Sequence, residues 1–285
     1  MWYRRTIGGV IVSKLVKKVA AVHDLAGIGR CSLTAAIPIL SVLGLQACPL
    51  PTAILSCQTD YPKFHFFDFT GEMKPYINTW NSMDLKFDGI YSGFLGSEDQ
   101  INIVIDLIEK HKEALIVVDP VMGDNGEKYK TYTEEMCNRI KELVRHADVV
   151  TPNLTECCIL TDRAYNDVTN EDNLLGIAKE ISELGPEKVV ITGVVKDDKV
   201  ITFAYDRKNN ESFFVSSSYN KKSYSGTGDI FTSIICGMLV NGSDFKKSVE
   251  KACDFIKKAV DITTLENSDE KNGILFEPLL KELFM

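Results

Sequence analysis

The stretch "SYSGTGDIFTSIICGM", residues Ser223 to Met238, places two glycines and an aspartate directly before a long apolar run. The run is apolar on nearly every side, which predicts a buried helix. Gly226, Thr227 and Gly228 would leave backbone N–H groups uncovered at the helix entry, where the helix dipole also attracts an anion. Asp229 in the same turn is placed to accept a proton from a hydroxyl that attacks a phosphoryl group.

The same residues also have a purely structural interpretation. Aspartate is a favoured N-cap, and the two glycines are typical of a tight turn. The nearly all-apolar helix that follows favours the functional interpretation, because the N-terminus of a buried helix lies in a sheltered crevice.

The composition indicates one large globular domain. A chain of 285 residues with 45% hydrophobic residues fills one large core, and we expect a single domain over residues 17–285. With 32 basic and 40 acidic residues the formal charge is −8. That balance argues against a nucleic-acid or anionic-membrane partner, since phosphate binding needs clustered Lys and Arg. No apolar stretch approaches the roughly 18 residues of a membrane span.

The cysteines and the N-terminal segment indicate the cellular compartment of the protein. Eight cysteines are spread from Cys31 to Cys253, and the closest pair, Cys157 and Cys158, is adjacent. This pattern favours reduced thiols in a cytoplasmic protein. Residues 1–16 are basic, but their apolar part is too short for a secretory signal, so we treat them as an N-terminal extension of unknown role.

Short apolar runs alternate with helix-length segments along the chain, which predicts a doubly wound α/β sheet. The expected buried strands cover 18–22, 89–91, 114–119, 148–152 and 188–193. The expected helices cover 33–43, 100–110, 134–144, 154–161 and 172–184. Residues 199–219 are typical of an antiparallel hairpin. Pro49, Pro51 and the aromatic segment 61–69 indicate an irregular excursion.

Polar residues follow several of these strands, at the edge where such sheets bind ligands. In "VVDPVMGD", Asp119 ends a buried strand, and a Mg²⁺ site would explain a buried acid there, although a simple Asp-Pro turn is the alternative. In "VVTPNLTE", Asn153 and Glu156 have the spacing of a capping box, and the two roles are compatible. "ITG" places Thr192 and Gly193 at the next strand end.

The first strand ends in the adjacent pair His23 and Asp24. Neighbouring residues on an extended strand point to opposite faces, so we expect one of the two to contact the substrate and do not expect an acid/base pair. "GIGRCS", residues 27–32, has two glycines of a dinucleotide fingerprint but Ser32 in place of the third.

Taken in order, "DPVMGD", "TPNLTE", "VVITG" and "SGTGDIF" resemble the ribokinase-like superfamily, and within it the vitamin B6 kinases, from about Lys18 onwards. The resemblance implies an α/β three-layer sandwich of nine or ten mostly parallel strands flanked by helices. It also implies ATP as phosphoryl donor, Mg²⁺, often a monovalent cation such as K⁺, and commonly a homodimer. A lid is expected to exclude water, formed by residues 61–69, by residues 123–132 or by both.

The resemblance implies roles residue by residue. Asp229 is similar to the base that deprotonates the substrate hydroxymethyl group, and Gly226, Thr227 and Gly228 to the anion hole. Asp119, Asn153 and Glu156 resemble the positions that bind Mg²⁺ and the triphosphate. Of these, Asp119 and Glu156 are the candidate metal ligands. Thr192 and Gly193 resemble positions near the nucleotide. Thr59 in "TAILSCQTDY" and Tyr91 in "YSGFLG" resemble contacts to the pyridine ring, with Tyr129 or Tyr132 in the flap over ATP.

Other functions stay open at this point. Several B6 kinases have Ser-His where this chain has His23-Asp24, and an aspartate there is similar to the hydroxymethylpyrimidine kinases, which are the first alternative. Sugar kinases rank third because they generally lack the TPN sequence. A non-catalytic α/β protein that binds a nucleotide or vitamer is a further alternative, although such a protein has no need of Asp229 beside the anion hole.

Overall fold

The centre of the protein is a nine-stranded sheet in the order β13-β12-β11-β10-β7-β6-β3-β4-β5. The computed structural model describes the chain except residues 1–4, 8–9, 13–15, 131, 166–170 and 285. The strands of this sheet are β3 (Lys18–Ala26), β4 (Gln46–Leu55), β5 (Phe66–Asp68), β6 (Gly89–Ser92), β7 (Leu115–Val118), β10 (Val149–Val150), β11 (Lys188–Lys196), β12 (Lys199–Asp206) and β13 (Glu211–Ser218).

The six strands from β11 to β4 pair in parallel. Both faces of such a sheet are covered, so its strands are apolar almost throughout, as the buried run of β3 illustrates. The mostly parallel α/β sandwich predicted from the sequence is confirmed.

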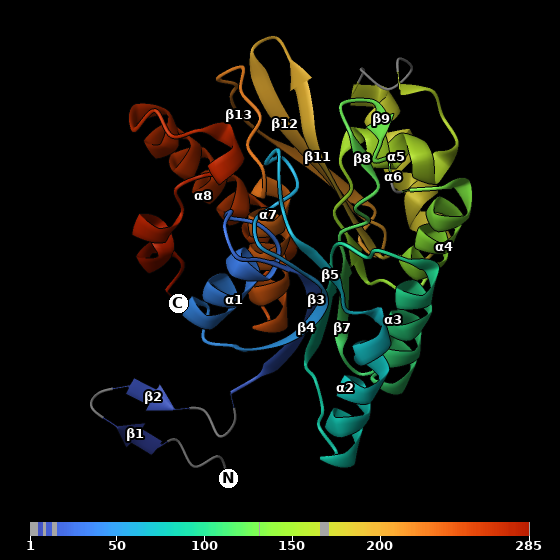
Figure 1. The fold of residues 1–285 in the computed structure, drawn as a ribbon. Coiled ribbons are helices and arrows are strands. Elements are labelled where there is room, and N and C mark those ends of the chain that lie inside the picture. Colours follow the sequence, from blue (N-terminus) through green and yellow to red (C-terminus); the bar gives the residue numbers. More distant parts are fainter. Residues whose placement is uncertain (1–4, 8–9, 13–15, 131, 166–170, 285) are drawn as a thin grey trace.

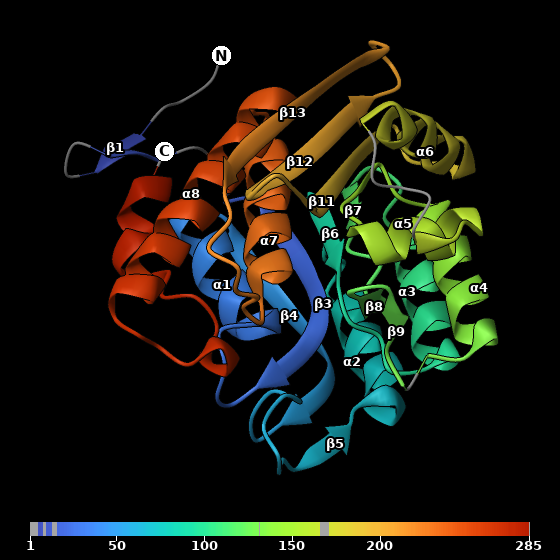
Figure 2. The same ribbon diagram turned by 90° about the horizontal axis from the view of Figure 1, so that it is seen from above.

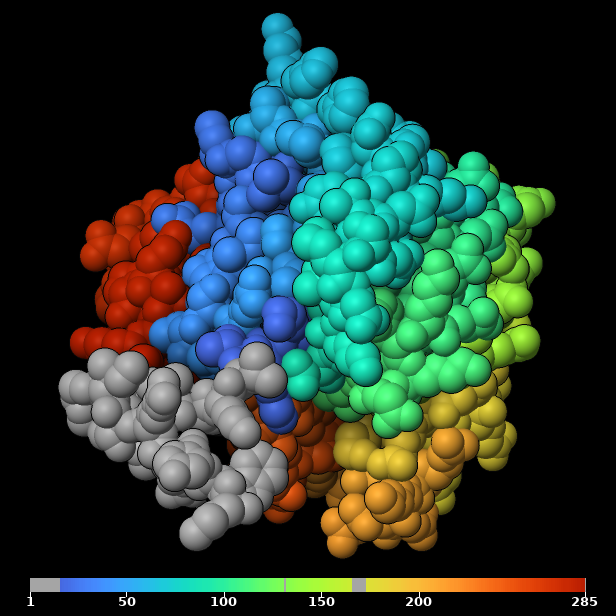
Figure 3. All heavy atoms as spheres, turned by 90° about the horizontal axis from the view of Figure 1, so that it is seen from below, coloured from blue at the N-terminus to red at the C-terminus, as the bar shows by residue number. Residues whose placement is uncertain are grey.

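Helices cover the sheet in two layers, which Figures 1 and 2 show on opposite sides of the strands. One layer contains α1 (Ser32–Val42), α7 (Thr227–Val240) and α8 (Phe245–Leu265). The other contains α2 (Thr70–Ser82), α3 (Glu98–Lys110), α4 (Glu134–Val144), α5 (Leu154–Thr161) and α6 (Glu171–Leu184). Each layer has its own cluster of buried apolar side chains against the sheet. In the space-filling view of Figure 3, blue and red segments gather on one side and teal and green segments on the other.

Most predicted elements are confirmed within two or three residues, including α4 and α5 at the expected bounds. The expected hairpin is formed by β12 and β13, and β12 also joins the central sheet antiparallel to β11. Helices α2 and α8 were not predicted.

The irregular excursion predicted around Pro49 and Pro51 is wrong for those two residues, because both lie inside β4. There β4 pairs with β3, while β5 pairs only with residues 53–55. Residues 46–52 therefore form an edge of the sheet, where a proline is tolerated. Within 61–69 the chain forms the short edge strand β5.

The remaining observations concern the cysteines, the N-terminus and membranes. All eight cysteines are reduced and none is in a disulfide bond, as predicted. The predicted extension, residues 1–16, lies largely outside the described residues, and within it β1 (Arg5–Ile7) pairs antiparallel with β2 (Val10–Val12). In the described part of the chain, no helix combines the length and the apolar character needed to cross a membrane.

Candidate active site

The carboxylate of Asp229 lies at the N-terminus of α7, where it contacts two other elements. Its Oδ1 is 2.7 Å from Nε2 of His23 on β3, and its Oδ2 accepts a hydrogen bond of 2.8 Å from the backbone N–H of Ser32 on α1. The N-cap of α7 is Gly226, and no side chain caps this helix. The alternative that Asp229 is only a helix cap is therefore wrong.

The turn before α7 is shaped by Gly226. Its φ of 80° lies in the left-handed region, and a Cβ there would come within 2.0 Å of the Arg30 carbonyl oxygen. Only glycine fits such a position. Gly228, two residues on, is exposed. The first N–H groups of a helix have no intrahelical acceptor, so this turn offers donors to an anion from solvent.

The prediction that His23 and Asp24 point to opposite faces of their strand is wrong, because the two side chains contact each other. Oδ1 of Asp24 is 2.8 Å from Nδ1 of His23, and it also accepts a hydrogen bond from the Ser32 hydroxyl. The register of β3 against β4 shifts between His23 and Leu25, which indicates a bulge. A bulge breaks the alternation of side chains along a strand, and this brings the two neighbours together.

His23 thus lies between two carboxylates and is only 2% exposed. Burial alone would lower the pKa of His23, but the charge and hydrogen bond of Asp229, followed by those of Asp24, raise it to about 10. Burial likewise opposes ionisation of Asp24, yet the hydrogen bond and charge of His23 lower the pKa of Asp24 below its usual value. The arrangement favours a protonated, cationic His23.

Asp119 follows β7 and is 8% exposed. A Cβ on Gly228 would lie 3.6 Å from its Oδ2, so Asp119 is next to the glycine turn. The Thr232 hydroxyl, one turn into α7, lies 3.5 Å from the same oxygen. Burial, and then the negative charge of Asp229, raises the pKa of Asp119 to about 7. A buried acid in this position is well placed to neutralise a bound cation.

We expect Asp119→Asn to stabilise the metal-free protein while lowering its activity. The folded-state pKa lies above the unfolded value of about 3.9, so the folded state binds the extra proton and the Asp119 charge lowers stability progressively from about pH 4 to pH 7. Asparagine removes this destabilisation. In buffer with EDTA the Tm should rise by roughly 2 to 6 °C at pH 8, and the rise should shrink towards pH 5. An unchanged or lower Tm at pH 8 would contradict this.

Asn153 and Glu156 form the predicted capping box at the start of α5. The two carboxylate oxygens of Glu156 accept backbone N–H groups of Met122 and Asn153, at 3.1 and 2.8 Å. The Asn153 amide donates to the carbonyl of Gly123. The start of α5 therefore holds the segment that follows Asp119. Burial, then the charge of Asp119, raises the pKa of Glu156 well above its usual value.

Thr192 and Gly193 lie where β11 departs from regular pairing. Thr192 forms an isolated parallel bridge with Asn153, and its N–H donates to the Pro152 carbonyl. Gly193 is exposed, and a Cβ there would have no neighbour within 4 Å. Two of the predicted strand ends are thus side by side, with open space at Gly193.

The two residues predicted to contact the pyridine ring, Thr59 and Tyr91, differ in exposure. Thr59 is exposed in the loop after β4, whereas Tyr91 is fully buried and lies edge to face with His23 at 6.2 Å. The structure thus places Tyr91 behind His23 and closed to solvent. Of the two flap candidates, Tyr132 is buried with its hydroxyl donating to the Leu95 carbonyl, while Tyr129 is 44% exposed. Only Tyr129 is free to cover a ligand.

Sequence reasoning missed Ser32 and Thr232. Ser32 has a φ of 52° and supplies both a backbone donor to Asp229 and a hydroxyl donor to Asp24. The sequence feature that could have identified Ser32 is its position, where a dinucleotide fingerprint has a glycine, since the backbone is left-handed there. Thr232 follows Asp229 by three residues, a spacing that places both on one side of the helix.

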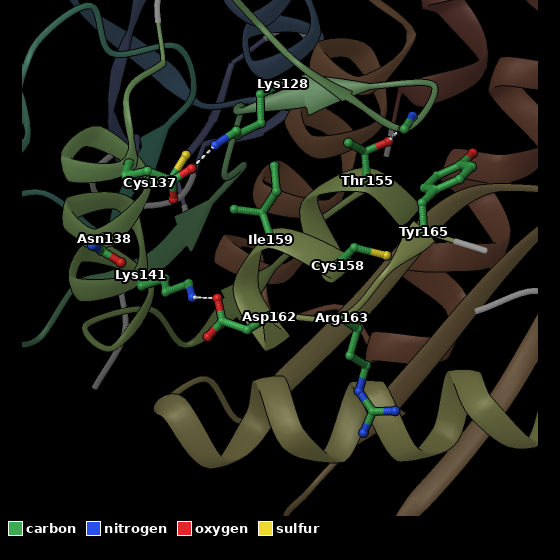
Figure 4. Close-up of a pocket in the computed structure, with 12 residues that line it drawn as sticks. Lys128, Cys137, Asn138, Lys141, Thr155, Cys158, Ile159, Asp162, Arg163 and Tyr165 are labelled. Atoms are coloured by element: carbon green, nitrogen blue, oxygen red, sulfur yellow. Dashed lines mark hydrogen bonds and ion pairs between the residues drawn. The ribbon is translucent and has the colours of Figure 1, made fainter. Parts of the chain in front are cut away.

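A pocket of about 230 Å³ lies between the β8–β9 hairpin, α4 and α5, as Figure 4 shows. The hairpin consists of β8 (Gly123–Asp124) and β9 (Glu127–Lys128). None of the predicted site residues lines this pocket. Its lysines are paired, Lys128 with Glu134 and Lys141 with Asp162. The pocket is therefore separate from the Asp229 site and presents mostly neutralised charge.

The position of Asp229 indicates the class of protein. An acid and an open glycine turn begin a buried helix, beside a second acid at a strand end of a mostly parallel sheet. This combination fits an α/β phosphotransferase, the class that the resemblance to the ribokinase-like superfamily implies.

The comparisons identify the family within that class. The sequence profile of the phosphomethylpyrimidine kinase family matches residues 33–274, and the chain belongs to this family. A protein of Bacteroides thetaiotaomicron VPI-5482, named for the phosphomethylpyrimidine kinases and crystallised with pyridoxal, is 43% identical. The two structures share a TM-score of 0.91 over 95% of this chain and 96% of that one.

Curated relatives include B6 kinases. The pyridoxine/pyridoxal/pyridoxamine kinase of Bordetella avium is 27% identical over 275 residues, which cover 90% of this chain and 88% of that protein. The pyridoxine kinase of Bacillus subtilis is 29% identical over 178 residues, 61% of this chain and 64% of that protein. The predicted ribokinase-like, B6-kinase relationship is confirmed.

Proposed function

We propose that the protein transfers the γ-phosphoryl group of ATP to the hydroxymethyl group of a B6 vitamer: pyridoxal, pyridoxamine or pyridoxine. The observation that carries the proposal is the Asp229 carboxylate at the open glycine turn of α7. The pyridoxal found in the Bacteroides relative supports the acceptor class. The kinase names of the relatives support ATP as the donor.

In the proposed reaction the substrate hydroxyl loses its proton to Asp229 while its oxygen forms a bond to the γ-phosphorus. The bond from that phosphorus to the bridging oxygen breaks, and ADP leaves. The N–H groups at Gly226 to Gly228 stabilise the charge on the transferred group. Positioning and charge neutralisation are expected to contribute most of the acceleration.

The residues fit a Mg²⁺ ion that is bound together with ATP. In the described ranges of the chain, no group of three or more His, Cys, Asp or Glu side chains is arranged to hold a metal by itself. Mg²⁺ commonly uses one or two carboxylates plus substrate phosphates. Asp119 is the better candidate ligand, because both oxygens of Glu156 already accept backbone N–H groups. The ion would supply positive charge to the phosphates.

Hydroxymethylpyrimidine is the second candidate acceptor, supported by the family match and by Asp24 at the end of the first strand. The deciding experiment measures ADP release by the purified protein with pyridoxal, pyridoxamine, pyridoxine, hydroxymethylpyrimidine and ribose. We expect the highest kcat/KM with a B6 vitamer. A higher kcat/KM with hydroxymethylpyrimidine would favour the alternative, and no turnover with any acceptor would refute the kinase proposal.

Several expectations stay predictions. They are the single domain over 17–285, the K⁺ requirement, the homodimer, the cytoplasmic location and the lid. Thr59 as a ring contact, and Thr192 and Gly193 as nucleotide contacts, are proposed on the same footing. Tyr91 is proposed only as a residue that packs behind His23, since its side chain is fully buried.

A further inference from the structure

His23 has almost no solvent-facing surface with which to bind a substrate. It is 2% exposed, and its two ring nitrogens face the carboxylates of Asp24 and Asp229 at 2.8 and 2.7 Å. On one side of the ring, a Cβ on Gly93 would lie 2.1 Å from Cδ2 of His23. The imidazole is thus enclosed, and a side chain at position 93 would displace it.

The two short contacts favour a ring that is protonated on both nitrogens. A neutral imidazole carries one N–H, so one of its nitrogens would face a carboxylate oxygen with lone pair against lone pair. The cation donates to both oxygens. The backbone N–H of Asp24 also lies 2.9 Å from Nδ1, and that of Phe94 lies 3.3 and 3.4 Å from Nδ1 and Nε2, contacts in which a neutral ring nitrogen would be the acceptor. The contact with Asp229 is the shortest of these, at 2.7 Å, and both carboxylate contacts are charge-assisted, so together they favour the cation.

The negative charges around the ring indicate what a protonated His23 does in the site. Asp229 and Asp24 each contact one ring nitrogen of His23, Asp119 is near enough for the charge of Asp229 to raise its pKa, and the Tyr91 ring packs against His23. Three carboxylates gathered in a partly buried site repel one another. One buried cation between Asp24 and Asp229 counteracts this repulsion.

We propose that His23 is a positioning residue for phosphoryl transfer: oriented by Asp24, it acts as a buried cation that orients the Asp229 carboxylate towards the acceptor hydroxyl. The Ser32 N–H fixes the second oxygen of Asp229. With one donor on each oxygen, each oxygen retains a further lone pair for the acceptor hydroxyl. This inference rests on the proposed function, in which Asp229 is the base.

The kinetic test compares His23→Gln, Asp24→Asn and the double variant with wild type. Glutamine keeps a donor but carries no charge. We expect His23→Gln to lower kcat by about 10- to 100-fold, the range of one charge-assisted hydrogen bond, with KM for both substrates within about threefold. Asp24→Asn keeps an oxygen that can accept the Ser32 hydroxyl and removes the charge beside His23, so the double variant should lose no more than His23→Gln. A raised KM with unchanged kcat would make His23 a substrate contact and overturn the proposal. A double variant whose loss in kcat equals the product of the two single losses would overturn it as well.

The control is His111→Gln, which removes a different, partly buried histidine whose ring contacts Phe87 at 5.0 Å. It should leave kcat unchanged. If it lowers kcat as much as His23→Gln does, loss of packing explains both and the proposal fails.

A second measurement is independent of turnover. In ¹⁵N-histidine-labelled, ligand-free protein at pH 8, one of the four imidazoles should have both nitrogens protonated, and its signals should be absent in His23→Gln. A neutral His23 at pH 8 would overturn the proposal even if the kinase is active. Conversely, a doubly protonated His23 in a protein that phosphorylates none of the acceptors would refute the proposed function and leave the ion pair established.

Discussion

Asp229→Asn should lower kcat by about 10² to 10⁴-fold, the usual loss on removing a general base. The amide has nearly the same shape as the carboxylate, so substrate binding should change little. It cannot take up the hydroxyl proton at neutral pH, and its N–H₂ group would face one of the two present donors, His23 or the Ser32 N–H. The measurement is ADP release under saturating ATP and the preferred acceptor.

The matched control for this variant is Asp244→Asn. Asp244 also stands at a helix start, where it is the N-cap of α8 and accepts the Lys247 N–H. Asn caps helices about as well as Asp, so stability and kcat should stay near wild type. If Asp229→Asn keeps wild-type kcat, Asp229 is not the base. If both variants lose activity equally, the loss does not report on the base.

Among substitutions that add one methyl group to the site, Gly226→Ala should cause the largest loss of stability and activity. It places a Cβ at φ 80° and within 2.0 Å of the Arg30 carbonyl oxygen, a backbone atom that cannot rotate away. The left-handed conformation costs an L-residue about 1 to 2 kcal/mol, and the overlap adds about 1 to 3 kcal/mol. Moving the turn also misaligns the N–H donors, and losing one such donor typically lowers kcat by about 10² to 10³-fold.

Gly44→Ala separates the two contributions. Gly44 has the same φ of 80°, but a Cβ there meets nothing within 4 Å. This variant should lose only the conformational part, roughly 2 to 6 °C in Tm, and keep its kcat. We expect Gly226→Ala to melt several degrees below it and to be nearly inactive. Equal Tm values together with full activity would show that the Arg30 contact does not constrain the turn.

Local patterns in the sequence were sufficient for most of the sheet and its helices. The near-continuous apolar strands and the amphipathic helices are short-range signals, and α4 and α5 begin and end where the pattern predicts. Helix α2 was missed because its 13 residues carry few apolar positions, and only Met73 and Ile77 are buried. Pro49 and Pro51 were misinterpreted because their edge position in the sheet depends on which strands pair, which no local pattern reveals.

For the site, the sequence determined the chemistry available at each strand end: a base with open donors at Gly226 to Asp229, and acids or amides at Asp119, Asn153 and Glu156. Each of these signals is local. The tertiary structure alone decided which side chains meet. A bulge in β3 turns His23 and Asp24 together, and folding brings His23 to Asp229 across 206 positions of sequence. Contacts over that separation depend on strand order and packing, so the ion pair at the base could not be predicted from the residues that form it.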